Sequence, residues 1–290
     1  MAVEKSSDII IQREYDFTVC DFEEIRKMIY KRAGITLSDS KQDMVYSRLA
    51  RRLRVNKLNN FKDYLGLLEN ENAIEWETFV NSLTTNLTSF FREAHHFPIL
   101  ADHIEKNRKN QQKFQIWCTA ASTGEEPYSL AMTMVQTFNS FSPPVHILAT
   151  DIDTNVLATA QQGIYSMDRM KNVPQDTLKQ FFLKGKGPHS GSARIRPELR
   201  SLVTFRQLNL QDKAWPMRGP FDAIFCRNVM IYFDKPTQYN ILQKFVPLLS
   251  QNGLMFAGHS ESFYHATDLF KLREKTVYEH ASTKGTKCLR

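Results

Sequence analysis

A series of short apolar runs in the second part of the chain limits its fold more than any other sequence feature. The runs are, in order, "FQIWC", "VHILATD", "LVTFRQLN", "FDAIFCRN" and "GLMFAGH", and helix-like stretches separate them. Strands that are apolar on both faces and alternate with helices are typical of a mainly parallel sheet covered on both sides. The sequence therefore predicts an α/β domain from residue 114 onward, with a final "KTVYEH" as an added edge strand.

The first part of the chain shows helical periodicity only, as in the spacing of Phe22, Ile25 and Ile29. The segments "LSDSKQDMVYSRLARRLRV", "FKDYLGLLE" and "IEWETFVNSL" continue this pattern with amphipathic helices. We therefore predict three parts: an all-helical N-terminal domain over residues 1–85, a linker over 86–113 and the α/β domain over 114–290.

An insertion interrupts the alternation of strands and helices. About fifty residues separate the strand that ends at Asp151 from the one that begins near Leu202, whereas a crossover needs only a dozen or so. Its second half, "KGKGPHSGSARIRPEL", has a glycine-rich turn followed by alternating apolar and basic residues. We predict a small antiparallel β insertion over about 165–203, containing an exposed hairpin. An appended hairpin can also be without function.

Composition restricts the class of protein. With 42% hydrophobic residues, no apolar run of roughly 18 residues and no signal peptide, we expect a soluble, cytoplasmic protein without membrane insertion. Four separated cysteines without a C-x-x-C pair, Cys20, Cys118, Cys226 and Cys288, predict no metal site and no disulfide framework. The net charge of +7 suits an acidic partner, which charge alone does not identify.

Polar residues follow the predicted strands where a doubly wound sheet binds its ligands, at the carboxyl ends. The turn 120–124 follows the first strand, Asp151 ends the second, Asn209 and Asp212 follow the third, and Arg227 and Asn228 follow the fourth. An acid at the end of the second strand suits a carboxylate that accepts hydrogen bonds from ribose hydroxyls. Acids after strands are also common helix N-caps, so both interpretations stay open here.

The turn "ASTGEEPYS" has one glycine, Gly124, and places Glu125 and Glu126 at a helix start. An acidic pair there would repel a pyrophosphate but not a cationic group. The turn thus favours an adenosyl ligand without phosphates, such as S-adenosylmethionine. The alternative is that the two glutamates only stabilise the helix N-terminus, and this feature does not decide between the two.

Five runs in the same order, "TTNLTSFFREAHHFPIL", "ASTGEEPYSLAM", "ATDIDTNVLATA", "GPFDAIFCRNVMIYFDK" and "GLMFAGHSESF", resemble the CheR family of chemotaxis receptor methyltransferases. The resemblance covers the chain from about residue 17 to residue 278. It implies a Rossmann-like class I methyltransferase sheet, S-adenosylmethionine as cofactor and S-adenosylhomocysteine as product. It further implies that the protein esterifies glutamates on the cytoplasmic helices of chemoreceptors. The implied cofactor-binding residues are Asn86, Thr88, Arg92, Glu126, Asp151, Asn209, Leu210, Arg227 and Asn228, so that the site begins within the linker.

The implied reaction explains which catalytic groups to expect. A glutamate carboxylate is ionised at neutral pH and needs no general base to attack a sulfonium methyl group. The enzyme has to supply alignment and a dry site. The resemblance implies that Arg92 orients the carboxylate and that Tyr232 stacks or donates near the reacting centre. In an arbitrary protein we would instead expect Arg92 to pair with Glu93 or Asp151, and Tyr232 to pack in the core.

Two further groups of residues suggest partner binding. On an ideal helix a basic sector of about 80° lies beside an apolar stripe; it contains Lys41, Arg48, Arg51 and Arg52. Such a face is usually just solvated, but the resemblance implies docking on the acidic methylation helices. Some family members capture a receptor C-terminal peptide at the inserted hairpin, and here Lys184 and Arg194 would meet its acidic groups by strand addition.

Two other functions would also suit parts of this sequence. A methyltransferase acting on nucleic acid would suit the basic charge, but the fourth strand continues as "CRNVMIYF" and lacks an Asn/Asp-Pro-Pro-aromatic segment. The chain also shows no aromatic-rich basic channel for single strands, so we expect no nucleic-acid partner. The other rival is a non-catalytic receptor-binding module, which the presence of Arg92 and Tyr232 disfavours. We expect a monomeric enzyme.

Overall fold

The computed structural model describes residues 13–70, 73–108 and 113–281, and its chain forms two compact units. The first unit runs up to Leu83 apart from Arg32–Ile35, and the second contains Arg32–Ile35 and the chain from Thr84 onward. None of the described helices is long and apolar enough to cross a membrane. The thiols of Cys118 and Cys226 are buried and Cys20 is exposed, whereas Cys288 lies outside the described residues.

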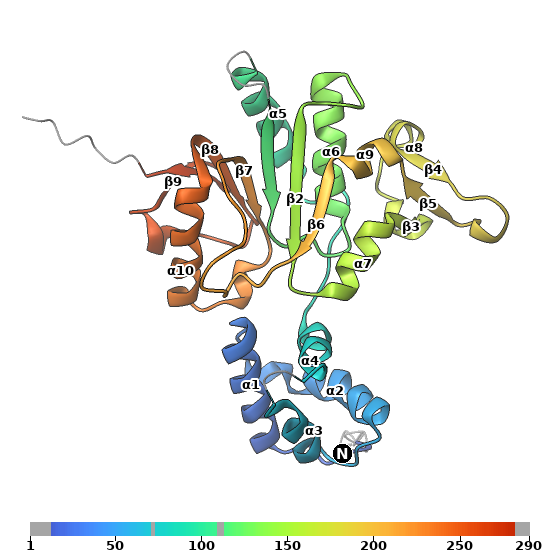
Figure 1. Ribbon diagram of the computed structural model, residues 1–290, viewed down its shortest axis with the longest axis vertical. Helices are drawn as coiled ribbons and strands as arrows, with labels where there is room; N and C mark the ends of the chain where they lie inside the picture. Colours follow the sequence, from blue (N-terminus) through green and yellow to red (C-terminus); the bar gives the residue numbers. More distant parts are fainter. Residues whose placement is uncertain (1–12, 71–72, 109–112, 282–290) are drawn as a thin grey trace, which may run out of the picture. The chain divides into compact units, whose positions relative to one another are not determined.

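Helices are the only regular elements among the described residues of the first unit, as predicted. Asn60 caps the third helix, because its side chain accepts the Asp63 N–H at 2.8 Å. The apolar faces of these helices form a core around Phe22, Leu49 and Phe79, each of which has no exposed surface. The elements are α1 (Val19–Ala33), the 3-10 helix η1 (Asp39–Lys41), α2 (Gln42–Asn56), α3 (Phe61–Leu68) and α4 (Glu75–Leu83) (Figure 1).

The second unit contains a seven-stranded sheet in the order β6-β2-β1-β7-β8-β10-β9. The first five strands in this order are parallel, and β10 pairs antiparallel with β8 and β9. The predicted mainly parallel sheet is therefore confirmed. The strands are β1 (Phe114–Cys118), β2 (Val145–Asp151), β6 (Val203–Gln207), β7 (Phe221–Cys226), β8 (Leu249–Ala257), β9 (Phe270–Glu274) and β10 (Val277–His280) (Figure 1).

Helices cover both faces of the sheet. Successive side chains of β1 therefore belong to two separate cores. Ile116 and Cys118 belong to the core that includes residues of α5, α6, α7 and α9. Trp117 belongs to the other core, where its ring lies 5.3 Å from that of Phe245 in α10. The helices are α5 (His96–Asn107), α6 (Glu125–Phe138), α7 (Thr154–Gln162), α9 (Pro197–Ser201) and α10 (Lys235–Phe245).

The prediction for the last strand was wrong. The segment "KTVYEH" forms β10, which lies inside the sheet between β8 and β9, and the edge strand is β9. Only Phe270 of the five β9 residues is buried, so this strand lacks the apolar pattern that identified the others. An edge strand has one unpaired side in water and tolerates charged residues there.

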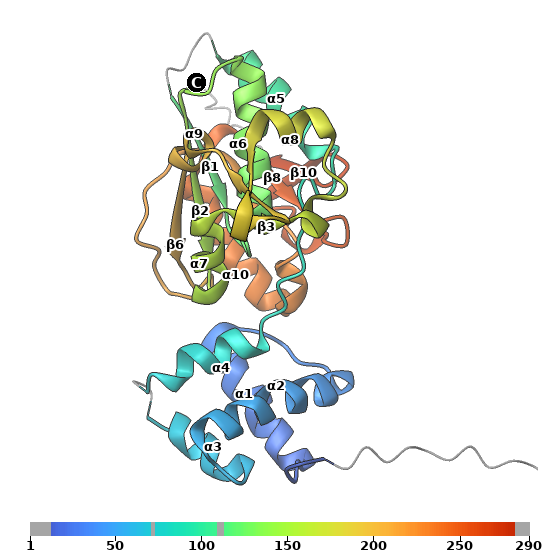
Figure 2. The same ribbon diagram turned by 90° about the vertical axis from the view of Figure 1, so that its right-hand side faces the viewer.

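The insertion folds as a three-stranded antiparallel sheet in the order β3-β5-β4 (Figure 1), and Figure 2 shows β3 and the helix α8 (Gln175–Phe181) of the same insertion from another side. The predicted hairpin is present as β4 (Phe182–Lys184) and β5 (Ser192–Ile195), while β3 (Ile164–Ser166) was not predicted. The helix α8 precedes β4. The hairpin is not wholly exposed, because Ala193 and Ile195 are buried.

Candidate functional site

The carboxyl ends of β6, β2, β1 and β7 lie side by side in the sheet, so the loops that follow them meet at one edge. Backbone hydrogen bonds fix the loop after β1 to its neighbours on both sides. The Thr119 N–H donates to the Phe225 carbonyl at 2.9 Å and the Ala121 N–H to the Thr150 carbonyl at 2.8 Å. The loop is thereby held at the ends of β7 and β2.

Asp151 lies at the centre of this edge and is almost fully buried. Its Oδ2 accepts the Ser122 N–H at 2.8 Å and its Oδ1 accepts the Asp153 N–H at 3.0 Å. Burial raises the pKa of Asp151 to about 6 against the opposing effect of these hydrogen bonds. Each carboxylate oxygen can accept a second hydrogen bond, so the group is suited to the two ribose hydroxyls of an adenosyl ligand.

Gly124 is the one position in the loop where only glycine fits. Its φ of +97° lies in the left-handed region. A Cβ here would lie 2.8 Å from the Tyr165 hydroxyl and 2.9 Å from the Ala160 Cβ. The Tyr165 hydroxyl donates to the Thr123 carbonyl at 2.7 Å, so a side chain from β3 in the insertion supports the loop.

The two glutamates at the start of α6 are each paired with an arginine. Glu126 Oε2 lies 2.9 Å from Arg227 Nη1, and Glu125 Oε1 accepts a hydrogen bond from Arg169 Nη1 at 2.7 Å. Their charges are therefore compensated inside the protein. The charge of this acidic pair therefore does not by itself exclude a phosphate, because a sequence pattern does not show the partners that neutralise it. Burial nevertheless raises the pKa of Glu126, which the charge of Arg227 opposes.

The segment 84–95, which precedes α5 in the second unit, carries three of the predicted site residues. The Asn86 amide donates to Asp153 Oδ2 at 2.8 Å, and its carbonyl accepts from the Ser122 hydroxyl at 3.1 Å. Asp153 also caps α7. Asn86 therefore fastens this segment to the loops after β1 and β2, and Thr88 next to it is half-buried.

Arg92 and Tyr232 are both half-buried. Their structural alternatives were an ion pair of Arg92 with Glu93 or Asp151 and packing of Tyr232 in the core. Arg92 Nη1 donates to the Leu87 carbonyl at 2.9 Å, and no hydrogen bond to Glu93 or Asp151 is formed. Tyr232 lies outside the core, in the 3-10 helix η4 (Met230–Tyr232), with its hydroxyl 3.5 Å from the Thr85 carbonyl.

The loop after β6 holds the next two predicted residues. The Asn209 side chain accepts the Gln211 N–H at 2.9 Å, and Leu210 is buried. Lys244 of α10 fixes the same loop, because its ammonium donates to the Leu210 and Asp212 carbonyls at 2.7 and 2.8 Å. The backbone of this loop is therefore held at the carboxyl edge.

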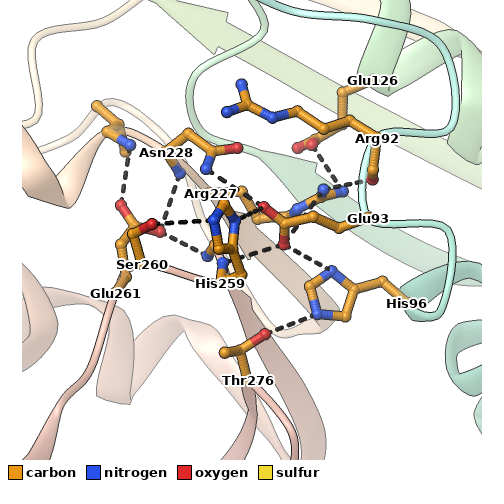
Figure 3. Close-up of polar contacts among 12 residues, drawn as sticks. Arg92, Glu93, His96, Glu126, Arg227, Asn228, His259, Ser260, Glu261 and Thr276 are labelled. Carbon is orange, nitrogen blue, oxygen red and sulfur yellow. Dashed lines mark hydrogen bonds and ion pairs between the residues drawn. The ribbon is translucent and has the colours of Figure 1, made fainter.

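Sequence analysis missed two carboxylates at this edge, Glu93 and Glu261 (Figure 3). Glu93 contacts Arg227, Asn228 and His259, and Glu261 accepts hydrogen bonds from the backbone after β7. Both lie in runs that were singled out for family resemblance. The carboxyl-end rule would have found Glu261, had it been applied to β8 as well as to the first four parallel strands.

Comparison with known families agrees with this geometry. Residues 86–279 match the model described as "CheR methyltransferase, SAM binding domain", and residues 21–84 match "CheR methyltransferase, all-alpha domain". The chain belongs to the CheR methyltransferase family. It is an S-adenosylmethionine-dependent methyltransferase of the chemotaxis type, and the predicted family, fold class and cofactor are confirmed. The two acceptor oxygens of Asp151 fit the ribose hydroxyls of this cofactor, as described above.

Two curated relatives of the CheR family illustrate the similarity. The chain is 50% identical to "Chemotaxis protein methyltransferase 2" of Pseudomonas aeruginosa, over 97% of this chain and all of that protein. It is 54% identical to "Chemotaxis protein methyltransferase" of Escherichia coli, over 89% of each chain.

The candidate docking residues of the first unit have different surroundings. Lys41 lies in η1 rather than in α2, so the ideal-helix sector does not include it. Arg51 is exposed, and half-buried Arg48 donates to the Ser82 carbonyl at 3.2 Å. Arg52 binds both oxygens of the Glu75 carboxylate at 2.9 Å, which fastens α2 to α4.

The candidate peptide-binding residues lie on neighbouring strands of the small sheet but on opposite faces, because Lys184 pairs with Ala193. Lys184 ends β4, and the neighbouring Leu183 is the pairing partner of Arg194 in β5. Both basic side chains are exposed. Because β5 is the central strand, a peptide could extend this sheet only along β3 or β4.

Proposed function

We propose that this protein transfers the methyl group of S-adenosylmethionine to glutamate side chains on the cytoplasmic helices of chemoreceptors, giving methyl esters. The observation that carries the proposal is the connection made by Arg227. This side chain pairs with Glu126 at the start of α6 and also donates to the Arg92 carbonyl. The candidate catalytic arginine is thereby tied to the cofactor half of the site.

The residues at the carboxyl edge are suited to hold the cofactor. Asp151 would accept the two ribose hydroxyls, and the Leu210 segment would line the adenine. Arg227 Nε is buried and makes no hydrogen bond within the described part of the chain, so it would bind the cofactor carboxylate. When bound, the cofactor supplies a methyl group on a sulfonium sulfur and leaves as S-adenosylhomocysteine.

The chain's own part in the reaction is alignment. Arg92 would hold one oxygen of the substrate carboxylate so that the other faces the methyl group, and Tyr232 would close the site against water. No proton has to move, because the substrate carboxylate is ionised at neutral pH. The half-buried state of both side chains leaves them within reach of a substrate.

We further assign receptor binding to both exposed basic groups. Lys41, Arg48 and Arg51 would dock on the acidic methylation helices, whereas Arg52 acts structurally through Glu75. Lys184 and Arg194 would bind an acidic C-terminal peptide of the receptor. The enzyme would act as a monomer in the cytoplasm, where those helices lie, with residues 1–85 for docking and residues 86–290 for cofactor binding and catalysis.

The test compares three acceptors under the same conditions. Purified protein and methyl-labelled S-adenosylmethionine are incubated with a receptor cytoplasmic fragment, with the same fragment carrying glutamine at its methylation sites, or with total RNA and DNA. Label transferred to the first acceptor alone supports the proposal. Label transferred to nucleic acid would favour the rival methyltransferase, and binding of the fragment without any transfer would favour the non-catalytic module.

A further inference from the structure

Asn228 joins two carboxylates that lie far apart in the sequence (Figure 3). Its backbone N–H donates to Glu261 Oε2 at 2.9 Å, and its side-chain amide donates to Glu93 Oε1 at 3.3 Å. The φ of Asn228 is +56°, a left-handed conformation that asparagine adopts more readily than most residues. The two hydrogen bonds therefore hold a residue whose backbone conformation is itself unusual.

Glu261 is a buried carboxylate that is bound almost entirely by the backbone. It accepts N–H groups from the loop after β7 and from Gly258, at distances between 2.5 and 3.0 Å. A Cβ at Gly258 would lie 2.8 Å from Glu261 Oε2, so the glycine allows this close approach. Four N–H groups surround the two carboxylate oxygens of Glu261. A neutral amide side chain would not fit here, because its own N–H groups would face these donors. The donating residues are Asn228, Val229, Met230 and Gly258.

Glu93 makes the corresponding connection on the other side of Asn228. Its oxygens accept the His259 N–H and ring Nδ1–H, each at 3.1 Å, and Oε2 lies 3.6 Å from Arg227 Nη2. Burial alone would raise the pKa of Glu93, but His259 and Arg227 outweigh this effect and lower it. Glu93 is therefore ionised at neutral pH. Its φ of +54° is again left-handed, at the residue directly after Arg92.

We infer that Glu93 and Glu261 are positioning residues, which set the two candidate catalytic side chains through Asn228. Glu261 fixes the start of η4 and so places Tyr232, and Glu93 fixes the backbone that carries Arg92. Asn228 couples the two. This inference rests on the catalytic roles proposed above for Arg92 and Tyr232.

The first test is a set of single and double variants of Glu93 in the receptor methylation assay. We expect Glu93→Gln to lower kcat about tenfold and to change the Kd for S-adenosylhomocysteine less than about threefold. In an Arg92→Ala background the same change should lower kcat less than about twofold, because Glu93 then has nothing to position. If Glu93→Gln lowered kcat by the same factor in the wild-type and Arg92→Ala backgrounds, the inference would be overturned. Glu198→Gln, at an exposed glutamate of α9, is the matched control.

The second test uses Asn228 and does not depend on folding of a Glu261 variant. Both Asn228→Gly and Asn228→Ala lose the amide that binds Glu93 and keep the N–H that Glu261 accepts, but only glycine permits the left-handed backbone without strain, so the comparison isolates the link through Glu261. We expect the glycine variant to keep at least about fivefold more kcat than the alanine variant. Equal kcat values for the two would contradict the inference. If the wild-type protein transfers no methyl group to the receptor fragment, the proposed function fails instead.

Discussion

Glu126 and Arg227 form an ion pair of 2.9 Å in which the arginine side chain is fully buried. The pair joins the first turn of α6 to the residue that follows β7. Because Arg227 also donates to the Arg92 carbonyl, one buried cation holds three parts of the site together.

Removing one charge of this pair should destabilise the protein strongly. Glu126→Gln removes the nearer counter-ion of the buried Arg227 cation and leaves only Glu93, at 3.6 Å, which we expect to lower the free energy of unfolding by about 3 kcal/mol. The matched change Glu125→Gln should cost only about 1 kcal/mol, because its partner Arg169 is partly in water. Urea unfolding of both variants measures the difference, and equal losses would show that burial of the pair does not matter.

Binding of the cofactor should weaken in acid through Asp151. Its pKa is raised to about 6, so the carboxylate that would accept the ribose hydroxyls becomes protonated below that pH. We expect the Kd for S-adenosylhomocysteine to increase about tenfold for each pH unit below about 6. Asp151→Asn should bind weakly with no such pH dependence. Calorimetric titrations of both proteins measure this, and a flat wild-type profile would refute the assignment.

The same group affects stability with a defined sign. A carboxyl group whose pKa is higher in the folded than in the unfolded protein binds more protons when folded, so its contribution to stability falls as pH rises. For Asp151 this loss should occur between about pH 4 and about pH 6 in the absence of ligand. Asp151→Asn should remove this part of the pH dependence in urea unfolding.

Gly124 and Gly66 should respond oppositely to replacement by alanine. Gly124→Ala forces a Cβ against the Tyr165 hydroxyl in a left-handed conformation, so we expect it to destabilise by about 2 kcal/mol and to impair cofactor binding. Gly66 lies in helix α3 with nothing near its added Cβ, and Gly66→Ala should stabilise by about 0.5 to 1 kcal/mol. Thermal unfolding with and without S-adenosylhomocysteine tests both. Tolerance of alanine at residue 124 would contradict the geometry.

Two adjacent arginines of α2 should have separable effects. Arg51→Glu reverses an exposed charge, which should raise KM for the receptor roughly fivefold, about 1 kcal/mol, and leave stability unchanged. Arg52→Glu breaks the two hydrogen bonds to Glu75 and should destabilise by about 2 kcal/mol. Steady-state kinetics and unfolding of each variant separate docking from structure. A KM unchanged in Arg51→Glu would exclude this face from docking.

The sequence predicted the elements whose signal is local. Strand β7 has six buried residues in a row, and it was recognised from that run alone. The edge strand β9 was missed because only Phe270 is buried there. The position of Asp151 followed from the rule that ligands bind at the carboxyl ends of parallel strands, which needs only the strand boundaries.

Pairings between distant residues could not be predicted in the same way. Arg52 looked like part of a solvated basic face, but Glu75, 23 positions later, binds it. The two glutamates of α6 looked like free negative charges, and their arginine partners lie 44 and 101 positions away. A spacing pattern describes the residues of one helix or strand. The net charge of a site also depends on side chains that other elements bring next to it.

The most direct test of the account is to locate the transferred methyl group. After reaction with a chemoreceptor cytoplasmic fragment, peptides are analysed by mass spectrometry before and after mild base. The account predicts methyl groups on glutamate side chains that base removes as methanol, with at least a tenfold lower rate for Arg92→Ala, roughly the cost of losing an aligning group. Methyl groups that resist base, or that lie on other side chains, would contradict it.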